Sequence, residues 1–480
     1  MSDLVKLTVE GREVEVPKGT MVLEAAKLAG ILVPHYCYHP SLPVAGVCRM
    51  CLVEIEKQPK LAASCATPVA EGMVVKVQTA PAREARQAVL EFLLINHPLD
   101  CPICDQAGEC ELQDYVFQEG RSATRYDEYA KRFNPVEEFG DDVLYVPNRC
   151  ILCTRCVRFM EHVADEAVLN VSERGDRAYI GIDEGHRLNH PWAGNVVDLC
   201  PVGSLISKDF LHKARAWDLD KTPSVCTGCT QGCNVTLETR DNTVLRVRPR
   251  TNERINRHFI CDEGRLGYPW MNRADRLEAP MVRQDGRLVA TDWERAFAAA
   301  ARLAGGGSAR GAVALVSPCA SNEALAAVAA LLTRLGGTGA FRVREGAEAP
   351  LAGIPNLALR KERAPNVHGA LAAGMSRDWA GVAGRAAGAG LVIALDESLE
   401  GVALGSAGVL YLGTVLSDPA RAHAAVVLPC CNAAEEEGSF TNRDGVVQAY
   451  WQAKAAPGMA RPAAWVLSEI AERAPAGATA

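Results

Sequence analysis

Sixteen side chains between Cys37 and Cys261, fifteen cysteines and one histidine, are of the types that bind iron. They fall into four groups of four, called here the first to fourth quartets: Cys37, Cys48, Cys51 and Cys65; His97, Cys101, Cys104 and Cys110; Cys150, Cys153, Cys156 and Cys200; Cys226, Cys229, Cys233 and Cys261. Thiolates in fours hold iron–sulfur clusters, which carry single electrons. The sequence therefore predicts four clusters that form a path for electrons.

The spacings within the quartets differ and indicate the cluster types. The third quartet reads Cys-x2-Cys-x2-Cys with a remote Cys200-Pro201, as in half of a bacterial two-cluster ferredoxin, and predicts a four-iron cluster. The second and fourth also combine three close ligands with a more distant one, which is typical of four-iron cubanes. The first has a longer first gap than the plant-type Cys-x4-Cys-x2-Cys, so it is a variant of a two-iron ferredoxin site.

His97 is the one predicted ligand that is not a cysteine. A lone histidine at a helix end more often compensates the helix dipole. Here three cysteines follow within thirteen residues and need a fourth ligand, so we expect the imidazole to bind iron. A neutral imidazole in place of a thiolate removes one negative charge and should change the potential of this cluster.

Other uses of the cysteines are less consistent with the sequence. Disulfide frameworks belong to small secreted chains, whereas this chain has 480 residues. Zinc also binds Cys-x2-Cys pairs and stays open as an alternative, although structural zinc sites usually join two short knuckles. Cys319, Cys430 and Cys431 lie outside the quartets, and we expect them to be buried as small hydrophobic residues.

The composition indicates an intracellular protein of several domains. A net charge of −7 leaves no basic patch for nucleic acid. The sequence has no run of eighteen or more apolar residues, and its start at Met1–Lys6 lacks the layout of a signal peptide. We therefore expect a soluble or peripheral chain.

The elements around the first quartet follow the order of a β-grasp ferredoxin. Alternating apolar residues at 5–9 and 14–16 predict a hairpin, and Thr20 is expected to cap a short helix that ends before Gly30. The cysteine loop follows, with Gly46 where a backbone must wrap closely round a cluster. A strand at 74–77 closes the predicted domain.

The later quartets need different scaffolds. An apolar face from Ala85 to Leu93 predicts a helix that stops at His97, because Pro98 disfavours helical backbone before it. A helix is expected after Cys156, and a hairpin with its turn at Asp241-Asn242 after Cys233. Apolar strands at 391–395 and 409–412, between alanine-rich helices, predict a parallel α/β layer. Glycine-rich stretches at 305–307 and 384–390 are interpreted as linkers.

Three arginines, Arg149, Arg155 and Arg158, lie close in sequence to the third quartet. They are interpreted either as solvated surface or as cations that raise the potential of the cluster.

The run Asn96-His97-Pro98-Leu99-Asp100-Cys101-Pro102, with four such quartets in this order, resembles the large iron–sulfur subunits of bacterial respiratory complex I, an NADH-quinone oxidoreductase. The resemblance is close over residues 1 to about 280. It implies a 2Fe-2S cluster on the first quartet and 4Fe-4S clusters on the other three. It also implies that the fourth cluster lies away from the main electron path, so that its role is mainly structural.

The resemblance implies a function as part of a proton-translocating enzyme complex. Electrons from NADH would enter an FMN on a partner subunit, cross the clusters of this chain and leave toward quinone through other peripheral-arm subunits. No catalytic residue is expected here, since the sequence has no G-x-G-x-x-G fingerprint and no Walker A loop. The implied location is peripheral, on the cytoplasmic side of the bacterial inner membrane, with contact to the membrane only through partners.

The C-terminal region resembles molybdopterin-dependent formate dehydrogenases only in fragments. These are Cys261–Arg265, Asn322-Glu323, Val426–Pro429 and Glu437–Asn442. We interpret it as a shortened scaffold that binds no molybdopterin. An electron-transfer subunit of an NAD-linked formate dehydrogenase or hydrogenase is the alternative function, and a zinc-stabilised scaffold is the non-redox one.

The expected fold class is multi-domain, α+β followed by α/β. The predicted domains are a 2Fe-2S ferredoxin-type domain at 1–80, a 4Fe-4S segment with one histidine and three cysteine ligands at 81–120, a 4Fe-4S ferredoxin-like domain at 121–218, a molybdopterin-oxidoreductase-type 4Fe-4S domain at 219–280 and a shortened α/β domain at 281–480.

Overall fold

The computed structural model describes residues 4–127, 131, 133–307 and 311–474. Residues 1–3, part of the Met1–Lys6 start that lacks a signal-peptide layout and of the predicted 1–80 domain, and residues 475–480 of the predicted 281–480 domain lie outside these ranges. The chain divides into two compact units, one of residues 1–218 with 351–355 and one of 219–350 with 356–480. No helix in the described ranges is long and apolar enough to cross a membrane.

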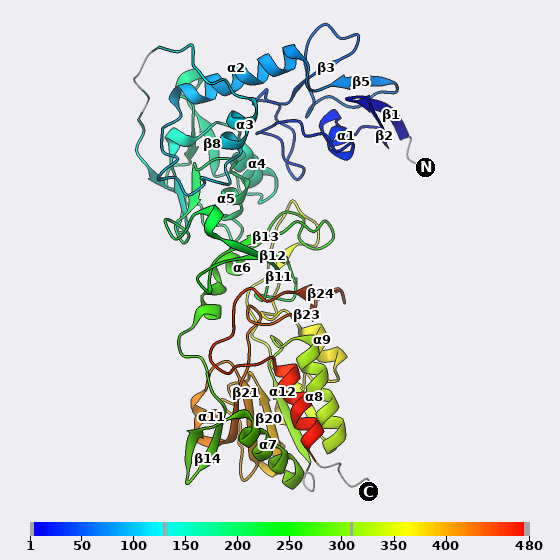
Figure 1. The fold of residues 1–480 in the computed structure, drawn as a ribbon, viewed down its shortest axis with the longest axis vertical. Helices are drawn as coiled ribbons and strands as arrows, with labels where there is room; N and C mark the ends of the chain where they lie inside the picture. The colour runs from blue at the N-terminus through cyan, green and yellow to red at the C-terminus, as the bar shows by residue number, and fades with distance from the viewer. Residues whose placement is uncertain (1–3, 128–130, 132, 308–310, 475–480) are drawn as a thin grey trace. The chain divides into compact units, whose positions relative to one another are not determined.

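The first unit begins with a five-stranded sheet in the order β2-β1-β5-β3-β4 (Figure 1). Its elements are β1 (Leu4–Val9), β2 (Arg12–Pro17), α1 (Val22–Leu28), β3 (Leu52–Ile55), β4 (Ala62–Ala63) and β5 (Met73–Lys76). The β1–β2 hairpin is antiparallel, whereas β5 lies parallel to β1. The predicted hairpin, helix and closing strand are thus present.

One detail of the first domain was predicted wrongly. Met21, not Thr20, occupies the N-cap of α1 and makes no side-chain cap. The Thr20 hydroxyl instead donates to the carbonyl oxygen of Pro17 at 2.7 Å, which closes the turn before the helix. A threonine hydroxyl readily bonds to nearby backbone in a turn, and that local choice has replaced the capping bond.

The rest of the first unit consists of one long helix, α2, several short helices and two small sheets. Its elements are α2 (Ala80–Asn96), α3 (Glu111–Glu119), β6 (Glu137–Glu138), β7 (Val143–Tyr145), η1 (Pro147–Arg149), α4 (Arg155–His162), β8 (Leu169–Ser172), η2 (Gly175–Arg177), β9 (Tyr179–Ile182), α5 (Asn195–Leu199), β10 (Leu205–Ser207) and η3 (Ala216–Asp218). The helix α2 ends at Asn96 with His97 in extended backbone as its C-cap, as Pro98 predicts.

The second unit opens with the antiparallel sheet of the fourth quartet. Its elements are β11 (Asp220–Val225), β12 (Asn234–Arg240), β13 (Thr243–Pro249), α6 (Asp262–Leu266) and η4 (Tyr268–Asn272). The predicted turn at Asp241-Asn242 joins β12 to β13, and both residues have positive φ, 50° and 60°.

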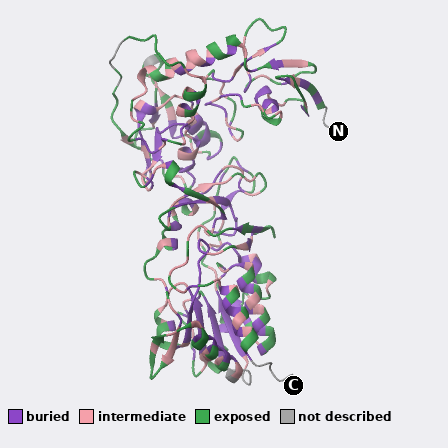
Figure 2. Cartoon of the chain, in the orientation of Figure 1, coloured by how far each residue is buried: buried purple, intermediate pink, exposed green. Residues whose placement is uncertain are grey.

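A seven-stranded sheet in the order β15-β14-β22-β21-β20-β16-β17 forms the core of the C-terminal region (Figure 1). Its strands are β14 (Met281–Gln284), β15 (Arg287–Ala290), β16 (Ala312–Val316), β17 (Thr338–Phe341), β20 (Leu391–Leu395), β21 (Gly408–Gly413) and β22 (Ala424–Pro429). The pairing of β20 with β21 is parallel, as predicted. The central strands of the seven-stranded sheet are buried, as Figure 2 shows.

Helices cover both faces of this sheet. The helices and small hairpins of the region are α7 (Trp293–Gly307), α8 (Asn322–Leu335), β18 (Ala349–Pro350), β19 (Ala358–Leu359), α9 (Val367–Ala372), α10 (Trp379–Ala383), η6 (Ala386–Gly388), α11 (Asp418–His423), β23 (Gly438–Thr441), β24 (Val447–Tyr450) and α12 (Ala463–Arg473). Ile393 belongs to the hydrophobic cluster that includes residues of α7, α8 and α12, whereas its neighbour Val392 belongs to the cluster that includes residues of α10 and α11. Alternate residues thus face opposite layers, which explains the continuous apolar strands.

The first glycine-rich stretch differs from the linker interpretation, whereas the second is a connection, as expected. Residues 305–307 form the last part of α7, and 384–390 form the short connection from α10 through η6 to β20. Alanine-rich flanking sequence keeps the first stretch helical despite the cost of glycine, which is about 1 kcal/mol per residue.

Candidate metal centres

The thiols of the first quartet meet where the loop that follows α1, which carries Cys37, Cys48 and Cys51, approaches Cys65 in the connection from β4 to β5. The Cys37 thiol shares hydrogen bonds with Cys48 and Cys65, and the Cys65 thiol shares one with Cys51. The hydrogen bond with Cys48 lowers the pKa of Cys37. The hydrogen bond with Cys37 raises the pKa of Cys65. The Cys37 backbone N–H also donates to Cys48 Sγ at 3.5 Å.

Gly46 in the same loop has a φ of +66°, a backbone conformation that glycine adopts without strain. The loop can therefore turn back on the thiols, as expected for a backbone that encloses a small inorganic group.

The second quartet lines a cavity of about 130 Å³ between α2, α3 and the loop that joins them. His97, Cys101, Cys104 and Cys110 all lie on its wall, with Arg149 beside them. One water needs only about 10–15 Å³ of such space, so the cavity has room for a group of several atoms. In the described ranges, no three or more His, Cys, Asp or Glu side chains are arranged to hold a single metal ion.

Burial sets the protonation of this second site. It lowers the pKa of His97 to about 4, helped by Arg149, so the imidazole is neutral near pH 7 and has a free lone pair to offer. Burial raises the pKa of Cys110 to about 11. Cys101 is exposed, so the site reaches the surface of the unit.

Gly203 shapes the wall behind Cys104. A Cβ at position 203 would lie 2.1 Å from Cys104 Sγ and 3.1 Å from the Gln106 Cβ. Only glycine leaves space for the sulfur atom at this point. The requirement comes from a residue 99 positions away in the chain, so sequence spacing gave no sign of it.

Of the third quartet, Cys150 and Cys153 lie in the loop from η1 to α4, Cys156 lies in the first turn of α4, and Cys200 follows the end of α5. Burial raises the pKa of Cys150 to about 11, of Cys153 to about 12 and of Cys200 to about 11. It also raises the pKa of Cys156 well above its ordinary value. Buried thiols with such pKa values lose their protons when a metal supplies the compensating positive charge. The Leu152 N–H donates to Cys150 Sγ at 3.4 Å.

The fourth quartet is gathered in the second unit. Burial raises the pKa of Cys226 to about 12, and the other three thiols shift in the same direction. The N–H groups of Gly228 and Gly264 donate to the Sγ atoms of Cys226 and Cys261, each at 3.4 Å. Backbone N–H···S bonds of this kind surround the sulfur atoms of iron–sulfur clusters.

The donor sets fit iron–sulfur clusters. Each quartet collects cysteine sulfur atoms, with one neutral imidazole in the second, beside N–H donors or cations, and most of these sulfur atoms are buried. When bound, such clusters supply one-electron redox chemistry.

The three cysteines outside the quartets are not alike. Cys430 and Cys431 are buried, as expected, whereas Cys319 is exposed, contrary to the prediction. Cys319 lies in the turn after β16 and opens onto a cavity of about 220 Å³. That cavity is also lined by Asp396, Cys430, Cys431, Glu436 and Tyr450.

The three arginines that the sequence places beside the third quartet are buried, which decides between the two interpretations left open above. Arg149, Arg155 and Arg158 are only 7%, 5% and 8% exposed, so they are not solvated surface. Arg149 Nε donates to Asp100 Oδ2 at 2.9 Å, and Arg158 Nη2 donates to the carbonyl oxygen of Cys153 at 3.2 Å. Their positions within two residues of predicted ligands were the available signal.

Five domain families match the chain, in an order that follows the quartets. They are a 2Fe-2S iron-sulfur cluster binding domain at 2–80, the NADH-ubiquinone oxidoreductase-G iron-sulfur binding region at 86–125, the ferredoxin-like domain of NADH-quinone oxidoreductase subunit 3 at 140–206, the molybdopterin oxidoreductase Fe4S4 domain at 219–273, and molybdopterin oxidoreductase at 276–366 and 407–473.

Curated relatives carry matching names. The NADH-quinone oxidoreductase G subunit of Rickettsia bellii is 43% identical over 298 residues, 62% of this chain and 44% of the relative. The mitochondrial NADH dehydrogenase [ubiquinone] iron-sulfur protein 1 of Solanum tuberosum is 43% identical over 340 residues, 71% of this chain and 46% of the relative. The chain thus spans less than half of these relatives.

A solved structure, that of an NAD+-reducing [NiFe]-hydrogenase in the H2-reduced state, matches with 30% identity and a TM-score of 0.40, over 44% of this chain and 90% of that one. From the named relatives and the matched domain families, we conclude that the chain is a homologue of the NADH-quinone oxidoreductase G subunits across its iron–sulfur domains.

Proposed function

We propose that this chain is the iron–sulfur electron-relay subunit of an NADH-quinone oxidoreductase. The single observation that carries the proposal is the set of four gathered quartets, of which the second and third lie within domain families named for this enzyme and the first and fourth within families named for iron–sulfur clusters. The subunit would take electrons from an NADH- and FMN-binding partner and deliver them toward quinone through other subunits of the peripheral arm.

The proposed ligands are assigned by quartet. Cys37, Cys48, Cys51 and Cys65 would hold a 2Fe-2S cluster. The second, third and fourth quartets would each hold a 4Fe-4S cluster, with His97 as the imidazole ligand of the second. Three observations support these assignments: the contacts among the thiols of the first quartet, the cavity shared by the second quartet, and the N–H···S bonds of the third and fourth quartets.

The chain's own residues have three tasks in this proposal. The cysteines and His97 would bind the iron atoms of the clusters, and burial of most of these side chains limits the access of water. Backbone N–H groups and buried arginines provide positive charge beside the sulfur atoms. We place the subunit on the cytoplasmic side of the bacterial inner membrane, where it would reach the membrane only through partners.

The domain division also stays a proposal. We assign the ferredoxin-type domain to 1–80, the segment with one histidine and three cysteine ligands to 81–120, the ferredoxin-like domain to 121–218, the fourth-quartet domain to 219–280 and the α/β domain to 281–480. We further propose that the last domain binds no molybdopterin. Pterin or molybdenum in amounts equal to the protein would overturn that part.

Low-temperature electron paramagnetic resonance of the reduced full-length protein tests the function. We expect one two-iron signal and three four-iron signals, with matching iron and sulfide. A colourless protein that contains zinc and no sulfide would overturn the proposal in favour of the zinc scaffold. Electron transfer from a formate dehydrogenase or hydrogenase partner, but not from an NADH- and FMN-binding one, would favour the alternative.

A further inference from the structure

Arg155 lies between two predicted ligands of the third quartet, Cys153 and Cys156, and its guanidinium reaches beyond that loop. Nη2 donates to the carbonyl oxygen of Tyr38 at 2.9 Å. Nη1 donates to Glu111 Oε1 at 3.1 Å and to the carbonyl oxygen of Leu199 at 3.3 Å. These three partners adjoin, in order, one predicted ligand each of the first, second and third quartets: Cys37, Cys110 and Cys200.

One group of this arginine is left without an acceptor. The Nε–H of Arg155 is buried and has no hydrogen-bond partner among the described residues. A buried donor that stays unpaired costs about 1–3 kcal/mol. The side chain is 6% exposed, so water does not readily satisfy the donor. The side chains of Cys153 and Cys200 interact electrostatically with this guanidinium, so the third site is near it.

We infer that Arg155 is a positioning residue that donates its Nε–H to a sulfur atom at the third site and holds that site in place against the first two. The inference rests on the proposed function. In each transfer one electron leaves a donor, which is oxidised, and enters an acceptor, which is reduced, while no bond or proton changes at Arg155. Its fixed charge and its N–H···S bond stabilise the more negative, reduced state, so Arg155 raises the reduction potential of the third site.

The test is a redox titration of the full-length protein, followed by electron paramagnetic resonance. In Arg155→Met, reduction of the third site should become about tenfold less favourable, which is about 59 mV for one electron. Arg125→Met is the matched control, because it also removes one arginine from the first unit. The Arg125 side chain is 68% exposed and pairs with Glu91, so this change should leave the potential unaltered.

A second variant separates the effect of charge on the reduction potential from an effect on folding. Glu111 pairs with Arg155 and its side chain is 37% exposed, so Glu111→Gln should fold and retain iron. Loss of its negative charge leaves the guanidinium less neutralised, and the potential of the third site should rise. A purely structural role for Arg155 would not shift the reduction potential of the third site in opposite directions in the two variants.

The outcomes are distinct. If Arg155→Met retains iron at the wild-type potential, the inference fails. If Arg155→Met loses its iron, the reduction potential of the third site in Glu111→Gln tests the inference instead. An unchanged or lower potential in Glu111→Gln overturns it. A wild-type protein without iron–sulfur signals would overturn the proposed function, and this inference with it.

Discussion

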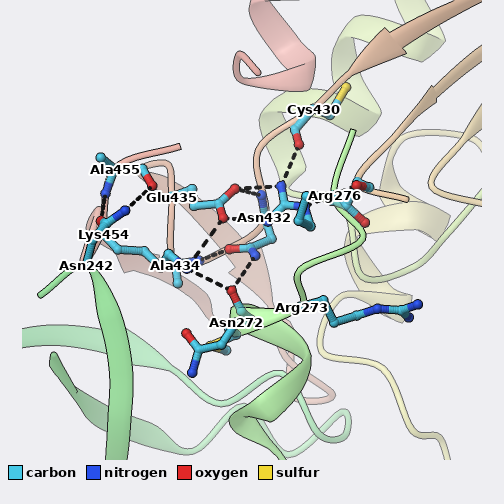
Figure 3. A network of polar contacts seen from close by, with 12 residues as sticks. Asn242, Asn272, Arg273, Arg276, Cys430, Asn432, Ala434, Glu435, Lys454 and Ala455 are labelled. Atoms are coloured by element: carbon cyan, nitrogen blue, oxygen red, sulfur yellow. Dashed lines mark hydrogen bonds and ion pairs between the residues drawn. The ribbon is translucent and has the colours of Figure 1, made fainter. Parts of the chain in front are cut away.

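Arg276 and Glu435 form a buried bidentate ion pair in the second unit, with Nη1–Oε1 at 2.5 Å and Nη2–Oε2 at 2.7 Å (Figure 3). Their side chains are 5% and 0% exposed. Arg276 also donates to the carbonyl oxygens of Cys430 and Thr414, at 3.0 and 3.1 Å. The pair therefore fixes the segment after η4, close in sequence to the fourth quartet, to the ends of β21 and β22.

Glu435→Gln should lower the free energy of unfolding by about 3–5 kcal/mol, because it leaves the buried Arg276 cation without a counter-charge. Urea denaturation of the full-length protein measures the change. Asp275→Asn is the control, since Asp275 pairs with Arg273 at the surface, where such pairs contribute about 0–1 kcal/mol. Equal losses in both variants would show that the buried pair has no special role.

Gly203→Ala should disrupt the second site, because the new Cβ would lie 2.1 Å from Cys104 Sγ. We expect loss of one four-iron signal, with the other signals retained. Gly388→Ala is the control, since a Cβ at 388 would meet no described heavy atom within 4 Å. An unaltered set of signals and full iron content in Gly203→Ala would contradict the proposed place of Cys104.

Features of the fold that depend on one short segment could be predicted from the sequence, whereas contacts between residues far apart in the chain could not. The β1–β2 hairpin and the parallel β20–β21 pair were predictable because each follows from the periodicity of a short segment. The quartets were predictable as candidates because cysteine spacing is itself local. The contacts of Arg155 were not, since Tyr38 and Glu111 lie 117 and 44 residues away. The exposure of Cys319 likewise depends on where the turn after β16 leaves the sheet.

Glu436 should make the stability of the second unit depend on pH. Burial raises the pKa of Glu436 from 4.5 to about 8, and the neighbouring carboxylates of Glu323, Glu435 and Asp396 add to the shift. Between these two pKa values the folded protein holds a proton that the unfolded chain has lost. The free energy of unfolding should therefore fall as the pH rises from about 5 to about 8.

Denaturation midpoints across this pH range test the effect. Glu436→Gln, which keeps an oxygen acceptor for the Tyr450 hydroxyl, should flatten the dependence and stabilise the protein at about pH 8. A variant with the same pH dependence as the wild type would assign the effect to other groups.

Cys229→Ala tests whether the fourth site conducts electrons or supports structure. Burial raises the pKa of Cys229, and its loop is joined to β12 and to the 360–363 segment of the same unit, since the Thr230 N–H donates to the carbonyl oxygen of Glu362 at 3.1 Å. We expect the variant to lose one four-iron signal and to unfold more easily. Transfer from NADH to quinone should persist in those complexes that still assemble. Cys153→Ala is the matched comparison, because it alters the third site and should abolish transfer. Loss of transfer in a fully assembled Cys229→Ala complex would place the fourth site on the electron path and rule out the structural role.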